Sequence, residues 1–222
     1  ARSCHHSKIG VVMNSPDEKL FPHRPPSSYR PPVNGAAPPF TIMYHGSLVE
    51  RNGLDLAVAA LARVREAVPG ARLRVYGRRT AFLESVMDDV RARGMQGCIE
   101  YLGPKPLESL AAEIENCDAG VIPNHRNRFT EINTPTRIFE YLALGKPVVA
   151  PRTPGIQDYF DPESLFFFEP GDPEDLAQKL KQVALNPGDA INIVRRGQTI
   201  YQAHRWSSER QKLTDLIRGL LE

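Results

Sequence analysis

Short apolar runs alternate with segments of helical periodicity from residue 40 onward. Between the first two runs, Leu54, Val58, Leu61 and Val64 recur on one face of a helix. The pattern predicts further helices over 82–93 and 107–115, from residues 135 and 173, and twice more before the C-terminus. The predicted strands are FTIMYHG from 40, RLRVYG from 72, CIEYLG from 98, AGVIP from 119, KPVVAP from 146 and SLFFFEP from 164.

This alternation predicts an α/β fold, a Rossmann-like parallel sheet of about six strands with helices on both faces. The first three strands end in Gly46, Gly77 and Gly103, where a backbone or a ligand can approach closely. Open sheets of this kind bind ligands beyond the carboxyl ends of their strands. We therefore expect the functional site at the edge that carries these glycines.

The first 39 residues have a different character. IGVVM at residues 9–13 is a short apolar run with strand character, and NSPDE after it predicts a turn. Residues 22–39 are rich in proline and lack hydrophobic periodicity, which predicts an extended linker. The predicted organisation is a junction and linker over 1–39, followed by one compact domain over 40–222.

Composition narrows the range of functions. The 222 residues are 41% hydrophobic, enough for one good-sized core, and the net charge of +2 does not call for nucleic acid as a partner. No apolar run approaches the ~20 residues that span a membrane. Three cysteines without metal-ligand spacing predict a reducing compartment, the cytoplasm, with Cys98 and Cys117 in the core. CHH at residues 4–6 is interpreted as a chain terminus rather than a metal site.

The segment TPTRIFEYLALGKPVVA, which starts at Thr134, begins with the features of an anion site. Thr134 is a good N-cap and Pro135 a good first helical residue, so Thr136 and Arg137 would present free backbone N–H groups. The helix dipole and the Arg137 guanidinium add positive charge at the same end. These features predict a phosphate site, although Thr-Pro also starts helices that bind nothing.

Glu140 follows one turn later, among Phe139, Tyr141 and Leu142. A carboxylate on a mostly apolar helix is costly to bury unless it is hydrogen-bonded. The two hydroxyls of a ribose would satisfy it, as happens in other nucleotide sites. The simpler alternative is a glutamate on the solvent side of the helix, and the adjacent anion site favours the nucleotide.

FEYLALGKPVVAP, from Phe139, resembles the signature of the group 1 (family four) retaining glycosyltransferases of GT-B fold. YHGSLVERNGLDLAVAAL, from Tyr44, is similar to the first strand and helix of their C-terminal, donor-binding domain, and RVYG, IEYLG and AGVIPN match its later strands in order. The resemblance extends from Phe40 to the C-terminus. VVMNSPDEKLF, from Val11, resembles the junction with an N-terminal, acceptor-binding domain, most of which would then be absent from this chain.

The resemblance implies a nucleoside-diphosphate sugar as the donor substrate, with no cofactor. Glu140 would bind the ribose, and the N–H groups of Thr136 and Arg137 would bind the diphosphate. The first glutamate of the family's pair, which faces the donor sugar, falls at Ile132. Glu131, one residue away, is therefore the candidate for that catalytic role.

The loop GSLVERNG departs from the family pattern. The family commonly has an arginine after the first glycine and a lysine before the second, where this chain has Ser47 and Asn52. Arg51 is the one cation in the loop and so the candidate for the catalytic phosphate contact. The remaining donor-binding candidates are Gly46, Ser47, Arg78 and Asn124.

The implied reaction moves a sugar to an acceptor hydroxyl with retention, in polysaccharide or glycolipid biosynthesis. Positive groups beside the leaving diphosphate would lower the barrier without a metal, and no Asp-x-Asp motif is placed to hold one. The acceptor, any base for it and any contact with the inner membrane face would belong to the N-terminal domain. The chain alone should bind donor with little or no turnover.

Two other functions stay open. A sugar-nucleotide epimerase of the same architecture would need acid and base groups around the sugar, and the six histidines mostly avoid the strand ends. A non-catalytic module that binds a nucleotide or a partner protein would account for Ser47, Asn52 and the shifted glutamate. A nicotinamide-dependent dehydrogenase is disfavoured because no G-x-G-x-x-G follows the first strand.

Overall fold

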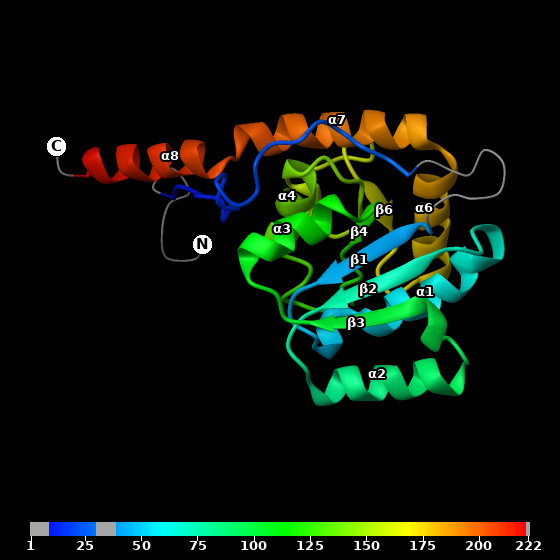
Figure 1. The fold of residues 1–222 in the computed structure, drawn as a ribbon. Helices are drawn as coiled ribbons and strands as arrows, with labels where there is room; N and C mark the ends of the chain where they lie inside the picture. Colours follow the sequence, from blue (N-terminus) through cyan, green and yellow to red (C-terminus); the bar gives the residue numbers. More distant parts are fainter. Residues whose placement is uncertain (1–8, 30–38, 221–222) are drawn as a thin grey trace.

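A computed structural model describes residues 9–29 and 39–220. Its centre is a six-stranded parallel sheet in the order β3-β2-β1-β4-β5-β6 (Figure 1). Each strand coincides with one of the apolar runs, which confirms the predicted α/β fold. The strands are β1 (Thr41–His45), β2 (Arg72–Tyr76), β3 (Ile99–Gly103), β4 (Ala119–Val121), β5 (Val148–Pro151) and β6 (Phe166–Phe168).

The predicted helices also form. They are α1 (Leu54–Ala67), α2 (Ala81–Ala92), α3 (Leu107–Glu115), α4 (Thr136–Ala143), α6 (Pro173–Leu185), α7 (Pro187–Ala203) and α8 (Trp206–Arg218). The sequence does not predict three shorter elements, namely η2 (Glu50–Asn52), η3 (Gln96–Cys98) and α5 (Pro154–Gln157). Elements of three or four residues are too short to show a helical period.

Helices cover both faces of the sheet. Helices α1, α2 and α6 pack on the face that carries Ile42 and Tyr44 of β1. Helices α3 and α4 pack on the opposite face with Met43, and Tyr201 of α7 joins them. Side chains alternate between the faces along a strand, and both faces are covered, so all five residues of β1 are buried.

The register of the sheet brings three strand ends together. His45 at the end of β1 pairs with Tyr76 of β2, and Tyr76 pairs with Gly103 of β3. Because all the strands are parallel, their carboxyl ends lie at one edge, where Gly46 and Gly77 begin the next loops. The backbone arrangement therefore opens the site at the edge that the sequence predicts.

The strand predicted at residues 9–13 does not form. The segment 9–29 lies instead along α8, α7 and α4 (Figure 1). The Met13 N–H donates to Glu209 of α8 at 2.8 Å, and the Gln198 side chain of α7 donates to the carbonyl oxygen of Arg24 at 2.7 Å. The prediction is wrong because the backbone of this segment bonds to helices and not to a free strand edge.

The predicted linker is described only in part. Its residues 22–29 lie against the domain, and Tyr29 packs its ring edge-on against Phe40. Residues 30–38 and the CHH motif fall outside the described residues. Cys98 and Cys117 are buried, as predicted for small core residues. Within 9–29 and 39–220, none of the helices combines the length and hydrophobicity that crossing a bilayer requires.

Candidate functional site

A cleft of about 510 Å³ opens at the carboxyl ends of β1 and β2. The loops after these strands, the start of α3 and the first turns of α4 form its walls. This is the position in which open parallel sheets bind ligands. The sequence-predicted residues that line it are Gly46, Ser47, Arg78, Arg137 and Glu140.

Helix α4 begins one residue later than predicted, with Pro135 as its N-cap. The prediction of Thr134 as the cap is wrong, because its hydroxyl donates to the carbonyl oxygen of Gly155 at 2.6 Å and so ties this loop to α5. The backbone N–H groups of Thr136 and Arg137 have no hydrogen-bond partner among the described residues. The start of α4 therefore keeps donors that an anion could accept.

The guanidinium of Arg137 is fixed against the end of β1. Its Nη1 donates to the carbonyl oxygen of His45 at 2.6 Å, its Nη2 donates to Asn124 Oδ1 at 3.4 Å, and the group lies 5.4 Å from the centre of the Tyr44 ring. Gly46 follows at φ 126°, and a Cβ there would lie 3.2 Å from Nη1. This positive charge lies on the cleft wall, beside a backbone conformation that favours glycine.

Glu140 lies largely inside the protein, with 14% of its side chain exposed. Its Oε2 is 2.6 Å from Nε2 of His45, whose side chain is 5% exposed. The second carboxylate oxygen has no partner among the described residues, and Glu140 lines the cleft. The alternative of a glutamate in bulk solvent is therefore excluded.

Tyr141 holds the opposite edge of the His45 ring. Its Oη lies 2.8 Å from His45 Nδ1 and 2.8 Å from the carbonyl oxygen of Met43, and the two rings meet edge to face at 5.0 Å. Gly120 of β4 makes room for this tyrosine, because a Cβ at that position would overlap its ring. A hydrogen-bonded chain thus runs from Met43 in the sheet to Glu140 at the cleft.

The charge state of His45 follows from its surroundings. Burial lowers the pKa of His45, the hydrogen bond and charge of Glu140 raise it by less, and the charge of Arg137 lowers it further. The balance of these effects favours the neutral ring over the charged one. With a carboxylate at Nε2, the one proton of the neutral ring is best placed on Nε2, where it is donated to Glu140.

The loop after β1 is braced by polar side chains. Ser47 and Asn52 occupy the places where the family pattern has cations, and Asn52 Nδ2 donates to the carbonyl oxygen of Ser47 at 2.8 Å. Tyr44 Oη donates to the same oxygen at 2.9 Å. Arg51 is exposed, with its guanidinium 5.4 Å from the centre of the Phe129 ring. Arg51 does not line the cleft.

The two residues predicted to be catalytic both lie beyond the cleft walls. Glu131 pairs with Arg126 at 3.2 Å, and Ile132 beside it is 77% exposed. Asn124 is buried and reaches the cleft through its contact with Arg137. Of the donor-binding candidates, Gly46, Ser47, Arg78, Arg137 and Glu140 line the cleft and Asn124 contacts Arg137. The candidates Thr136 and Arg51, and the catalytic candidate Glu131, do not line it.

The structure separates the neighbouring arginines Arg78 and Arg79. Arg78 lines the cleft, whereas Arg79 beside it forms an exposed ion pair with Glu84. His125, in the loop after β4, is half-buried and pairs with Asp55 at 3.0 Å.

Sequence reasoning misses His45. The statement that histidines mostly avoid the strand ends fails here, because His45 is the last residue of β1 and lines the cleft. One signal was available. His45 is a polar residue in an otherwise apolar run, directly before the glycine that ends the strand.

The charges around the cleft suit an anion. Its lining residues include the cations Arg78, Lys105 and Arg137, against the one carboxylate of Glu140. In the part of the chain that the structure describes, no three His, Cys, Asp or Glu residues are grouped so that they could hold a metal ion. The cleft can therefore take a phosphate through cations and N–H donors, with a carboxylate acceptor nearby.

Comparison with protein families agrees with this geometry. The model of the family described as "Glycosyl transferases group 1" matches residues 39–186, well over half of the chain. The match runs from before β1 to the end of α6, so it includes all the residues that line the cleft.

Individual relatives are more distant. WcaL of Escherichia coli strain K12, named as a candidate colanic acid biosynthesis glycosyltransferase, is 25% identical over 203 residues, which are 87% of this chain and 46% of WcaL. Glycogen synthase of Mycobacterium tuberculosis is 27% identical over 150 residues, 68% of this chain and 33% of that protein. The chain thus spans less than half the length of these relatives.

Solved structures share the fold. HepE of Anabaena, crystallised in complex with UDP, superposes with a TM-score of 0.77 at 18% identity. The match covers 95% of this chain and 57% of HepE.

Proposed function

The chain belongs to the group 1 glycosyl transferases, and from this we propose that its cleft binds the nucleoside diphosphate of a sugar donor. The observation that carries the proposal is that Arg137 and Glu140, one turn apart on α4, line the same cleft. A diphosphate requires positive charge and N–H donors, and a ribose requires an acceptor for two hydroxyls. Helix α4 presents the cation at its start and the carboxylate one turn later, and in a nucleotide the diphosphate is likewise next to the ribose.

We propose that the reaction is a metal-independent, retaining transfer of the sugar to an acceptor hydroxyl. The departing diphosphate gains negative charge as the glycosidic bond breaks, and Arg137, Arg78 and the start of α4 would stabilise that charge. Arg51 and Glu131 are proposed to contact the leaving phosphate and the donor sugar. Because neither lines the cleft, these roles require their loops to move toward bound donor.

Acceptor binding is proposed to belong to an N-terminal domain. The chain matches 46% of WcaL, which leaves room in such a protein for a second half that faces this cleft. The names of WcaL and glycogen synthase support a polysaccharide acceptor. A glycolipid at the cytoplasmic face of a membrane is the alternative acceptor that we propose. Any general base would lie in that second half.

Isothermal titration calorimetry with UDP, GDP and ADP tests donor binding. UDP is the first ligand to try, because HepE was crystallised with it. Arg137→Ala removes a fixed cation and Glu140→Ala removes the ribose acceptor. Each loss of a charged hydrogen-bond partner should weaken binding by about tenfold or more.

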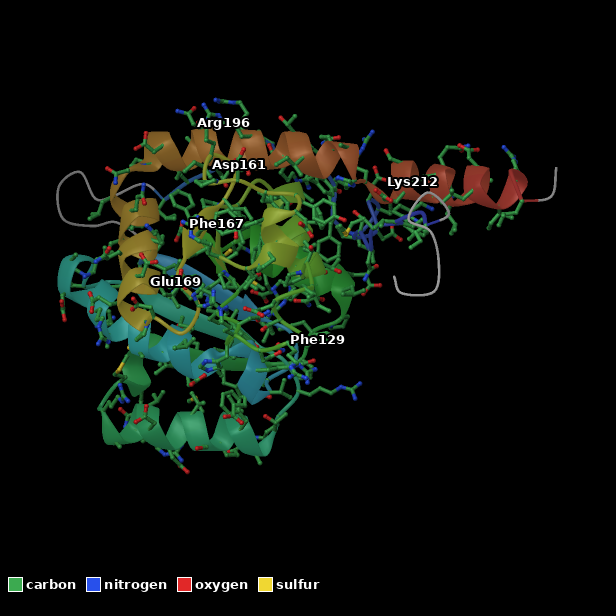
Figure 2. The ribbon with its side chains drawn as sticks, turned by 180° about the vertical axis from the view of Figure 1, so that it is seen from behind. Phe129, Asp161, Phe167, Glu169, Arg196 and Lys212 are labelled. Atoms are coloured by element: carbon green, nitrogen blue, oxygen red, sulfur yellow. The ribbon has the colours of Figure 1, made fainter. Side chains whose placement is uncertain are left out.

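Matched controls lie outside the cleft. Arg196 on the outer face of α7 (Figure 2) pairs with Glu163 at 2.6 Å, and both side chains are exposed. Arg196→Ala and Glu163→Ala change the net charge as the test variants do, and should bind nucleotide like the wild type. If the wild type binds none of the three nucleotides, the transferase proposal fails and a module that binds a partner protein takes its place.

A further inference from the structure

We propose that His45 is a positioning residue that holds the Glu140 carboxylate in the orientation in which it binds the ribose hydroxyls of the donor. The inference rests on the proposed function, because that function assigns the ribose to Glu140. The inference adds His45, which the sequence pattern does not identify, to the binding site. Its role in nucleotide binding can be measured separately from its effect on folding.

The contact is short and is made in a buried setting. His45 Nε2 lies 2.6 Å from Glu140 Oε2, with 5% and 14% of the two side chains exposed. A glutamate side chain has three rotatable bonds, and their freedom would otherwise be lost when the ligand binds. A preformed contact removes that loss from the binding step.

The proton positions support the same assignment. Tyr141 has one hydroxyl proton and two acceptors at 2.8 Å, the carbonyl oxygen of Met43 and His45 Nδ1. If Tyr141 donates to Nδ1, a neutral His45 carries its proton on Nε2. If Tyr141 donates to Met43, Nδ1 carries a proton, and Nε2 donates to Glu140 only when the ring is charged. An N–H at Nε2 therefore faces Glu140 in the first arrangement with a neutral ring and in the second with a charged ring.

The carboxylate keeps capacity for a ligand. An ionised carboxylate offers about four acceptor positions, and His45 uses one of them. The second oxygen has no partner among the described residues, and Glu140 faces the cleft. Two ribose hydroxyls can therefore be accepted while the contact with His45 is intact.

His45 also links the ribose group to the diphosphate group. Its carbonyl oxygen accepts the hydrogen bond from Arg137 Nη1 at 2.6 Å, while its ring holds Glu140. A substitution at position 45 retains the first contact, which comes from the backbone, and changes the second. The side-chain role can thus be separated from the anchoring of Arg137.

The test compares two amide substitutions that differ in which ring nitrogen they imitate. His45→Gln places an amide N–H near the position of Nε2, within reach of Glu140. His45→Asn is one bond shorter and reaches only toward Tyr141. Calorimetry measures the dissociation constants of UDP and 2′,3′-dideoxy-UDP for both variants and the wild type. GDP and ADP are each compared with their 2′,3′-dideoxy forms in the same way. Thermal melts verify that each variant is folded.

We expect the wild type to bind UDP about tenfold or more tightly than its dideoxy counterpart, the worth of a charge-assisted hydrogen bond. His45→Asn should reduce this ratio to about threefold or less, mainly because UDP binds more weakly. His45→Gln should retain most of the ratio. Tyr141→Phe keeps the ring and removes the support of Nδ1, so its ratio should fall between the two. It also serves as the second variant if His45→Asn does not fold.

Each contrary outcome has a separate meaning. If the wild type binds nucleotides with a ribose preference and His45→Asn retains that preference, the role of His45 is wrong and the proposed function stands. Equal loss in His45→Asn and His45→Gln would also overturn it, because a structural disturbance alone would produce that result. If the wild type binds no nucleotide, or binds without ribose preference, the proposed function of Glu140 fails and this inference fails with it.

Discussion

His45 contacts both charged α4 residues of the cleft, each through different atoms. Its carbonyl oxygen accepts from Arg137, and its ring donates to Glu140. The ring is buried, and its pKa lies below the ordinary value because of that burial. The same property that keeps His45 neutral in the site therefore makes the folded protein sensitive to acid.

This burial predicts a pH dependence of stability. A histidine with a lowered pKa in the folded state binds a proton more readily when unfolded, so its contribution is complete above about pH 6.5 and is lost as the pH falls toward the folded-state pKa. Urea denaturation should show the free energy of unfolding of the wild type falling more steeply below about pH 6.5 than that of His45→Gln. Parallel pH profiles for the two proteins would show that His45 titrates normally in the fold.

At the scale of the element, α4 joins the core to the cleft. Phe139 and Leu142 are buried on the side of α4 that packs into the core, while Arg137 and Glu140 line the cleft. The position of the helix against the sheet depends on Gly120, where Tyr141 packs directly on the β4 backbone. The geometry of the charged residues is thus set by close packing on the other side of the same helix.

A single methyl group at Gly120 should displace this packing. The Cβ of Gly120→Ala would overlap the Tyr141 ring, and overpacking of a filled core costs about 1–3 kcal/mol. Because Tyr141 supports His45, nucleotide binding should weaken together with stability. Gly97→Ala is the control, since a Cβ there meets nothing within 4 Å, and it should change the free energy of unfolding by less than about 0.5 kcal/mol. Chemical denaturation and calorimetry would measure both; unchanged stability in Gly120→Ala would show that α4 can shift without cost.

At the scale of the molecule, we propose that the described domain binds the donor and forms one side of a transfer site. Its cleft is built from loops at one edge of a sheet, and the acceptor is proposed to approach from a second domain. Binding and transfer should therefore separate experimentally, since binding requires one wall of the site and transfer requires both.

Residues 1–222 should bind the preferred nucleotide by calorimetry and transfer no sugar to an added saccharide acceptor above the uncatalysed rate. A longer protein that also contains the proposed acceptor-binding domain should be active, and its activity should survive EDTA, because cations of the chain would stabilise the leaving diphosphate. Transfer by residues 1–222 alone would contradict the two-domain proposal. Loss of activity with EDTA, restored by a divalent ion, would contradict metal independence.

Much of the fold was accessible from the sequence because local patterns encode it. Buried strands appear as short apolar runs and helices show their own period, so β1 to β6 and the longer helices could be located one by one. Arg137 and Glu140 could be found for the same reason, since their relation is fixed by one helical turn. The short η2, η3 and α5 carry no period and were not predicted.

The sequence by itself determined the order of the strands and helices along the chain, and which charged residues share α4. The tertiary structure alone decided which residues meet them: His45 contacts Glu140 across 95 positions, and the Thr134 hydroxyl bonds Gly155 instead of capping its own helix. It also decided that the apolar run at 9–13 forms no strand and that its last residue, Met13, bonds to α8. The physical reason is that hydrogen-bond partners distant in the chain are chosen by packing, which no local period records.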